Sequence, residues 1–305
     1  YTPLATQYLF ELIDRELDLP AGLLNLLVCD GPVANHLTVS RDVHKVSFTG
    51  STNVGRQIVQ NSGQSNLKAV TLELGGKSPC IFFDDTPDLD AAIDRAFTVM
   101  FSHKGEKCSE PTRFLIQKGS YDYVMSRLIE KAEAVRCGDP LSSDAQQGPQ
   151  CNAAQFKRIM DYIEIGKGEA ELVAGGYADQ QGDNANGLFI RPTIFANVPA
   201  SARIAQEEIF GPVLSCTPFD NAEEALTLAN DTTYGLAAGV YTGNINVAHQ
   251  MADRLDAGMI FVNRYGCYGL SSPFGGFKES GWGKEMAIHS LSSYTKTKGV
   301  WIAYG

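Results

Sequence analysis

The hydrophobic and polar positions of the chain follow two periods, one typical of helices and one typical of buried strands. Residues 3–17 place apolar side chains on one face of a helix, which a Pro-Ala-Gly turn beginning at residue 20 ends. The apolar runs 23–28 and 45–49 predict buried strands, and residues 33–38 between them predict a short helix. Helix, strand, helix, strand is the order of a doubly wound α/β fold.

The same alternation restarts after residue 77 and continues almost to the last residue. Further strands are expected at 69–74, 80–83, 113–117, 171–174, 237–241 and 259–263. Further helices are expected at 89–101, 121–135, 155–167, 222–230 and 246–255. The glycine-rich segment 265–283 is expected to be too flexible to form core, and the alternating residues 293–302 predict a last strand.

Composition and charge limit the class of partner. A chain of 305 residues, 44% hydrophobic and 20% charged, is long enough for two domains with a large buried core. The formal charge of −10, without any basic run interleaved with aromatics, argues against a nucleic-acid surface. Because there is no run of 18 apolar residues, we expect no membrane partner.

The seven cysteines show neither the spacing of a disulfide scaffold nor that of a metal site. They are odd in number, widely scattered and without any Cys-x-x-Cys pair, so neither a disulfide scaffold nor a metal site is expected. This usage is typical of reduced thiols in a cytoplasmic enzyme.

A carboxylate and a thiol stand out as candidate chemistry. Glu73 follows an apolar run and precedes two glycines, which predicts a strand-end position, where α/β enzymes place their chemistry. Cys108 follows a polar, glycine-containing break, which favours a loop over the core, and Lys107 beside it would favour the thiolate. A base that activates water and a thiol that forms a covalent intermediate are what thiol-dependent acyl transfer needs. Taken alone, Glu73 is also consistent with a solvated glutamate at a strand end, and Cys108 with an inert buried cysteine.

Residues 50–56 form a glycine-containing turn that opens a helix extending to about residue 59. Ser51 is the expected N-cap, and a helix N-terminus behind Gly50 is a ready anion site. The turn is not a nucleotide P-loop, because Arg56 and Gln57 replace the required lysine and hydroxyl residue. An ordinary capped turn is the alternative.

Five ordered segments together resemble the aldehyde dehydrogenase superfamily. Glu73 and Cys108 lie 35 positions apart, close to the spacing of the glutamate and cysteine signatures of that family. The matching segments are 48–55 (Phe-Thr-Gly-Ser-Thr-Asn-Val-Gly), 72–79 (Leu-Glu-Leu-Gly-Gly-Lys-Ser-Pro), 105–113 (Gly-Glu-Lys-Cys-Ser-Glu-Pro-Thr-Arg), 207–212 (Glu-Glu-Ile-Phe-Gly-Pro) and 273–281 (Pro-Phe-Gly-Gly-Phe-Lys-Glu-Ser-Gly). Glu106 stands where glutamine is common in the family.

The resemblance implies an aldehyde dehydrogenase-like α/β fold. It implies part of a Rossmann-type dinucleotide-binding domain over residues 1–77, an α/β catalytic domain over 78–275 and a C-terminal segment with an oligomerisation strand over 276–305. It also implies a homodimer or homotetramer. Since the match begins just after the family's adenosine-contacting segment, we expect roughly the first third of a typical member, including an oxyanion-hole asparagine, to lie outside this sequence. A sheet halved in this way would expose an unpaired edge.

The implied activity is NAD- or NADP-dependent oxidation of a small-molecule aldehyde to a carboxylic acid. Cys108 would form a thiohemiacetal and then a thioester, and Glu73 would activate the water that hydrolyses it. The implied cofactor-binding residues are Gly50, Ser51, Leu74, Glu208 and Phe210. The implied substrate-contacting residues are Cys267, Tyr268 and Phe274.

Three alternatives remain at this stage. A catalytically impaired fragment could act only as an assembly or binding partner, and absent cofactor binding would favour it. A cofactor-free thiol hydrolase would use His103 as the base for Cys108. A CoA-acylating enzyme is the third, although such family members usually lack the glutamate found here as Glu73.

Overall fold

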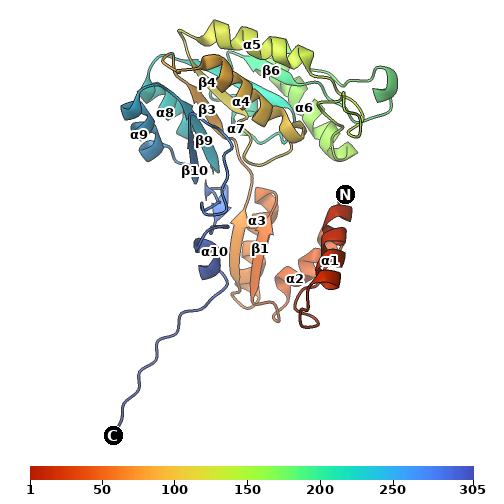
Figure 1. The fold of residues 1–305 in the computed structure, drawn as a ribbon, viewed down its shortest axis with the longest axis vertical. Coiled ribbons are helices and arrows are strands. Elements are labelled where there is room, and N and C mark those ends of the chain that lie inside the picture. Colours follow the sequence, from red (N-terminus) through yellow and green to blue (C-terminus); the bar gives the residue numbers. More distant parts are fainter. The chain divides into compact units, whose positions relative to one another are not determined.

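A computed structural model describes residues 1–305. The chain divides into two compact units, one formed by Tyr1–Val46 with Arg56–Val70 and the other by Ser47–Gly55 with Thr71–Gly305. The domain boundaries expected after residues 77 and 275 stay predictions. The elements are drawn in Figure 1.

The smaller unit is built on helices. It contains α1 (Leu4–Glu16), α2 (Gly31–Val39) and most of α3 (Thr52–Gln64). Asp30 caps α2 by accepting a hydrogen bond from the Val33 N–H at 3.1 Å. The Asn61 amide of α3 donates to Asn35 Oδ1 and Thr38 Oγ1 at 2.8 and 2.7 Å, so polar contacts join α2 to α3.

Two expected strands are absent, and these expectations were wrong. Residues 23–28 form no strand, and the large apolar side chains among them are between 38 and 61% exposed. Residues 293–302 also form no strand. An apolar or alternating run expresses a preference for burial, but a strand requires a neighbour that completes its hydrogen-bond ladder. No strand of residues 1–305 pairs with either segment.

The larger unit contains a seven-stranded sheet in the order β10-β9-β3-β4-β7-β6-β5. The strands are β3 (Pro79–Phe82), β4 (Arg113–Gln117), β5 (Glu171–Ala174), β6 (Thr193–Ala196), β7 (Val213–Phe219), β9 (Ala237–Tyr241) and β10 (Met259–Val262). All neighbouring pairs are parallel except β5 with β6. Sequence reasoning did not identify β7, because Ser215, Thr217 and Pro218 interrupt its apolar run.

Helices bury both faces of this sheet (Figure 1). They are α4 (Leu89–Phe101), α5 (Tyr121–Ala134), α6 (Ala153–Glu169), α7 (Arg203–Gln206), α8 (Ala222–Asn230) and α9 (Ile245–Arg254). The short helix α10 (His289–Ser292) has no buried residue and is not among them. Strand β3 shows the alternation, since Phe82 packs in a cluster with α4 and α5 while Ile81 packs in one with α8 and α9. The predicted α/β fold class is confirmed.

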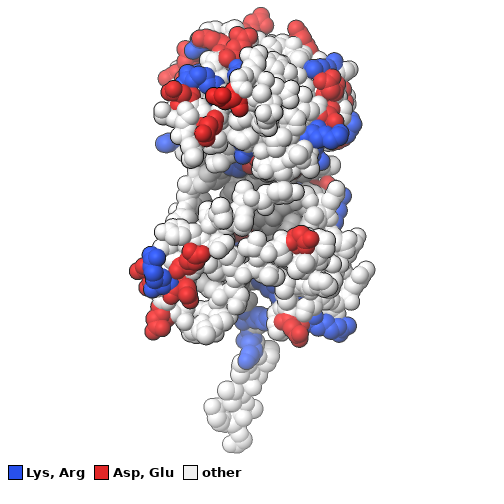
Figure 2. All heavy atoms as spheres, turned by 90° about the vertical axis from the view of Figure 1, so that its right-hand side faces the viewer, with Lys and Arg blue, Asp and Glu red and all other residues white.

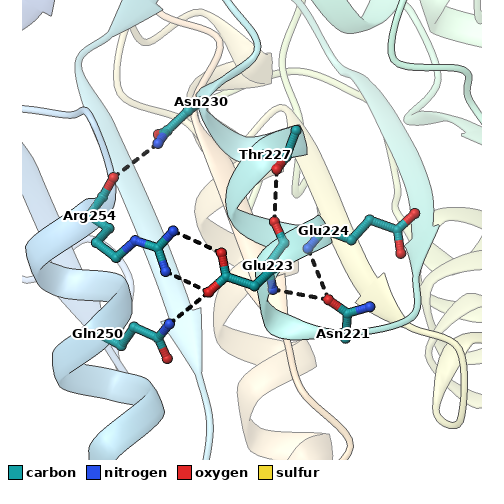
Figure 3. Close-up of polar contacts among 7 residues, drawn as sticks. All are labelled: Asn221, Glu223, Glu224, Thr227, Asn230, Gln250 and Arg254. Carbon is teal, nitrogen blue, oxygen red and sulfur yellow. Dashed lines mark hydrogen bonds and ion pairs between the residues drawn. The ribbon is translucent and has the colours of Figure 1, made fainter.

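A surface ion pair joins α8 to α9 (Figure 3). The Arg254 guanidinium donates to both carboxylate oxygens of Glu223, at 2.5 and 2.8 Å, and Gln250 donates to the same carboxylate at 2.9 Å. Asn221 begins α8 by accepting from the N–H groups of Glu223 and Glu224. These contacts orient two helices that cover one face of the sheet.

The chain also contains two small sheets. β11 (Phe277–Lys278) pairs with β8 (Tyr234–Gly235), and β12 (Gly281–Trp282) pairs with β2 (Ala69–Glu73). The three-stranded sheet has the order β1-β2-β12, with β1 spanning Lys45–Thr49. The paired register of Gly281 with Glu73 brings the glycine-rich segment to the end of β2.

The expectation that residues 265–283 are too flexible to form core was wrong at several positions. Tyr265 and Ser280 are fully buried. The Ser280 hydroxyl donates to the Gly75 carbonyl at 2.6 Å and accepts from the Gly235 N–H at 3.0 Å. Glycine content signals conformational freedom in an isolated chain, but here backbone pairing and a buried hydroxyl fix the segment.

Acidic and basic side chains are interspersed on the face of the chain shown in Figure 2. None of the helices combines the length and the apolar character that a membrane crossing requires.

The Ser280 hydroxyl provides a stability test. Ser280→Ala would leave the buried Gly235 N–H without an acceptor, so we expect unfolding free energy to fall by about 1–3 kcal/mol. Ser271→Ala, on the exposed part of the same segment, is the matched control and should change it by less than about 0.5 kcal/mol. Urea denaturation of the purified variants measures both, and equal midpoints would contradict this role for Ser280.

Candidate active site

A cleft of about 550 Å³ in the larger unit brings together most of the residues that the sequence singled out. Its walls include Gly50, Ser51, Leu74, Cys108, Glu208 and Phe210. These residues come from four separate segments of the chain, and each segment reaches the cleft through a specific backbone arrangement.

The first segment is the start of helix α3. The Gly50 N–H donates to the Glu73 carbonyl at 3.0 Å, which ties this turn to the end of β2. The Ser51 hydroxyl accepts from the Val54 N–H at 3.4 Å, so the predicted N-cap is confirmed. The first N–H groups of a helix have no partner within the helix, and here they border the cleft. A helix start of this kind favours an anion.

The glycine pair after Glu73 is required by close packing. A Cβ atom on Gly75 would lie 2.5 Å from Glu208 Oε2, and one on Gly76 would lie 2.4 Å from the Cys108 carbonyl oxygen. The Gly76 N–H donates to Glu208 Oε1 at 3.0 Å. Two glycines therefore let the strand end, the Cys108 loop and the Glu208 carboxylate share one small volume.

Glu208 and Phe210 are held by α6. The Arg158 guanidinium donates to the Glu208 carbonyl at 2.6 Å, and the Gln155 amide donates to the carbonyls of Ile209 and Phe210 at 3.0 and 2.7 Å. Phe210 has a φ of 61°, a strained value for a residue with a side chain, and these two hydrogen bonds help to fix it. Burial raises the pKa of Glu208, while the Gly76 N–H and Lys77 lower it.

Cys108 lies in the loop after β3 and α4, as expected, and its side chain is half-buried. Burial raises the pKa of the thiol to about 11, and the nearby Glu208 and Glu73 carboxylates raise it further, while Lys107 lowers it. The thiol therefore requires either a base or additional positive charge to become a nucleophile at neutral pH.

Glu73 is at the end of β2, as predicted, but it does not line the cleft. Its side chain is only 4% exposed, and Oε2 has no hydrogen-bond partner. Burial raises its pKa to about 8, with a further rise from Glu285 and a reduction from Lys284. A Cβ atom on Gly275 would lie 2.6 Å from Glu73 Oε1, so this carboxyl faces the glycine-rich segment.

The three predicted substrate residues lie together in a second cavity. Cys267, Tyr268 and Phe274 line a space of about 260 Å³, and the Tyr268 and Phe274 rings are 5.9 Å apart. The Tyr268 hydroxyl is 2.7 Å from the Ser109 hydroxyl, which links this cavity to the residue that follows Cys108. Cys108 is not among the residues that line it.

His103 does not support a cysteine–histidine pair. Its side chain is exposed, and it makes no hydrogen bond to Cys108. Its φ of 48° lies within the short 3₁₀ turn Ser102–Gly105 that leads into the Cys108 loop.

Sequence reasoning missed three buried residues that support the site. The Arg113 guanidinium donates to the carbonyls of Lys77, Leu228 and Ala229 at 2.9, 2.8 and 2.7 Å. The Tyr265 hydroxyl donates to the Ser109 carbonyl at 2.9 Å, and Glu110 is fully buried two positions after Cys108. Arg113 and Glu110 lie in the segment that contains Cys108, but nothing in a single sequence distinguishes a buried charge from an exposed one.

Comparison with known proteins addresses the identity of the chain. A sequence profile of the Aldehyde dehydrogenase family matches residues 1–300. An aldehyde dehydrogenase of Emericella nidulans is 45% identical over the whole chain, which covers 60% of that protein. Aldehyde dehydrogenase 1A1 of Gallus gallus is also 45% identical, with 99% of the chain covering 58% of it.

A solved structure gives the same result. Betaine aldehyde dehydrogenase of Staphylococcus aureus, solved in complex with NAD+, matches 96% of the chain with a TM-score of 0.93 and 36% identity. The match covers 58% of that protein, so the chain spans about three fifths of the length of these relatives. The profile match covers nearly every residue, and the signature cysteine and the glutamate beside the glycine pair lie in one compact unit. This chain belongs to the aldehyde dehydrogenase family.

Proposed function

We propose that the protein oxidises an aldehyde to a carboxylic acid with a nicotinamide dinucleotide, using Cys108 as the nucleophile. The observation that supports this most is the shared cleft, where a half-buried thiol lies with a helix N-terminus and a carboxylate. A thiol alone would suit many reactions. A thiol that lies beside an anion site, and beside a carboxylate able to bind hydroxyl groups, fits a reaction that uses a nucleotide cofactor.

The cleft fits such a cofactor on its own residues. The uncovered N–H groups at the start of α3, behind Gly50 and Ser51, would hold a pyrophosphate, and the Glu208 carboxylate would hold ribose hydroxyls. Gly75 leaves room for that carboxylate, because any Cβ atom there would collide with it. Leu74 and Phe210 supply apolar walls. When bound, the cofactor accepts the hydride that leaves the substrate carbon.

Cys108 would provide the covalent step. Its thiolate attacks the carbonyl carbon of the aldehyde, forming a carbon–sulfur bond and an oxyanion, and the Cys108 backbone N–H is a candidate donor to that oxyanion. Loss of hydride from the same carbon leaves a thioester on Cys108. An aldehyde is required, because only a carbonyl carbon that bears hydrogen can lose hydride.

Glu73 would act in hydrolysis of the thioester. A carboxylate with its pKa raised to about 8 is a stronger base than an ordinary glutamate, so it can accept a proton from water near neutral pH. Water then adds to the thioester carbon, the carbon–sulfur bond breaks, and the carboxylic acid leaves. Its burial and its unpaired Oε2 support this role, because an acid without a structural partner is available for a water molecule.

Trapping the acyl intermediate tests these two roles. With p-nitrophenyl acetate, which acylates thiols without a cofactor, Glu73→Gln should give one burst of nitrophenolate and then turn over about 10²–10⁴-fold more slowly. Intact mass and peptide mapping should find the acetyl group on Cys108. Cys108→Ala should give neither burst nor adduct at this position. Turnover that survives Glu73→Gln but is lost in His103→Ala would instead favour the cofactor-free hydrolase.

The pH dependence of deacylation tests the raised pKa of Glu73. The ionised form is the base, so the turnover rate at saturating ester should rise with pH and level off above about 8. Below that pH, each unit should lower the rate about tenfold, in proportion to the ionised fraction. A stopped-flow series on the native protein and Glu73→Gln measures this, and a plateau that begins near pH 5 would contradict it.

Adjacent glutamates allow a matched test of cofactor binding. Glu208→Gln removes the charge from the cleft but keeps an acceptor for the Gly76 N–H, and we expect NAD+ to bind about tenfold more weakly. Glu207→Gln is the control, because that exposed carboxylate pairs with Arg203. Isothermal titration calorimetry measures both. If the folded native protein binds neither NAD+ nor NADP+, the assembly or binding-partner alternative is favoured.

A further inference from the structure

The Cys108 turn rests on a buried acid that the proposed mechanism does not use. The Glu110 N–H donates to the Lys107 carbonyl at 3.3 Å, closing a tight turn with Cys108 inside it, and the Thr112 N–H donates to the Glu110 carbonyl at 2.9 Å. The Glu110 side chain is 0% exposed. Its carboxyl is therefore enclosed by the turn that presents the thiol.

Only one of the two oxygens of the Glu110 carboxyl has a hydrogen-bond partner. Oε1 accepts from the Ser102 hydroxyl at 3.2 Å, while Oε2 has no hydrogen-bond partner. A buried carboxylate without compensation is costly, so a nearby cation has a large effect on it. The Lys107 ammonium lies 4.0 Å from Oε1. Lys104 also acts on Glu110, but its ammonium pairs with Glu106 at 3.1 Å.

Lys107 connects this acid to the cleft. Its side chain is 31% exposed and lines the cleft beside Cys108, and its ammonium lies 5.8 Å from the centre of the Tyr268 ring. A lysine side chain with this exposure has several accessible rotamers. Attraction to Glu110 and to the ring restricts that freedom.

We propose that Glu110 is a positioning residue, which holds the Lys107 ammonium beside the Cys108 turn and thereby increases the reactivity of the thiol. The proposal rests on Cys108 being the nucleophile of the proposed function. Lys107 lines the cleft beside Cys108, and its positive charge favours the Cys108 thiolate. Losing Glu110 should then act by releasing Lys107.

The surrounding charges are consistent with this arrangement. Cys108 faces Glu73 from the end of β2 and Glu208 from the loop after α7, and both oppose the thiolate. The other ionisable groups around Glu110 are Lys104, Glu106, Tyr265 and Tyr268. Burial raises the pKa of Glu110 to about 8, below that of the thiol at about 11. The Glu110 carboxyl is therefore ionised above about pH 8, where it can attract the Lys107 ammonium.

Alkylation of Cys108 by iodoacetamide tests the proposal without any cofactor or aldehyde. The purified protein is alkylated at about pH 9, above the raised pKa of Glu110, and peptide mapping follows Cys108, with exposed Cys29 as the internal reference. Glu110→Gln and Lys107→Met should each slow the alkylation of Cys108 about threefold. The double variant should be no slower than Lys107→Met alone.

Two further variants separate positioning from folding. Lys107→Arg keeps the cation and should keep the native alkylation rate, and Lys104→Met, which removes a cation of the same loop, should leave that rate unchanged. A native rate in Glu110→Gln, or additive losses of rate in the double variant, would overturn the proposal. If Glu110→Gln fails to fold, a native rate in Lys107→Met overturns it equally. The alkylation rates of these variants do not affect whether an acyl group is trapped on Cys108. Failure of the proposal for Glu110 is therefore distinct from failure of the proposed function.

Discussion

The site depends on one steric constraint, the absence of side chains at Gly75 and Gly76. The end of β2, the Cys108 loop and the Glu208 carboxylate approach so closely that a single Cβ atom would collide with the carboxylate at one glycine and with the Cys108 carbonyl at the other. The Gly76 N–H is then free to bind Glu208. Because neither glycine carries a side chain, the end of β2, the Cys108 loop and the Glu208 carboxylate can approach one another.

Desolvation is the second feature that unites the site. Burial is the largest influence on Glu73, Cys108, Glu110 and Glu208, and in each case it raises the pKa. For a carboxyl this moves ionisation towards neutral pH, whereas for the thiol it works against the ionised form. The same burial means that a positive charge near Cys108 favours its thiolate, and Lys107 carries such a charge.

The support for these groups comes from backbone carbonyls held by buried donors. Arg113 binds three carbonyls from two segments, Ser280 joins the glycine pair to β8, and Tyr265 binds the carbonyl next to Cys108. A buried donor that satisfies a loop carbonyl makes the loop as costly to displace as a strand. Buried donors of this kind hold both the glycine-rich segment and the loop that carries Cys108.

Local sequence predicted many of the helices and strands of the larger unit and the candidate reactive groups. Helix 89–101 and strands 171–174 and 237–241 were predicted to the residue, because their periodicity is strong and their ends are marked by caps or turns. The signature segments named Cys108, Glu73 and Glu208. Tertiary structure alone decided that residues 23–28 and 293–302 are not strands, since a ladder needs a partner that no local pattern specifies. It also decided that Glu110 and Ser280 are buried, because burial depends on what packs against a residue and not on the residue itself.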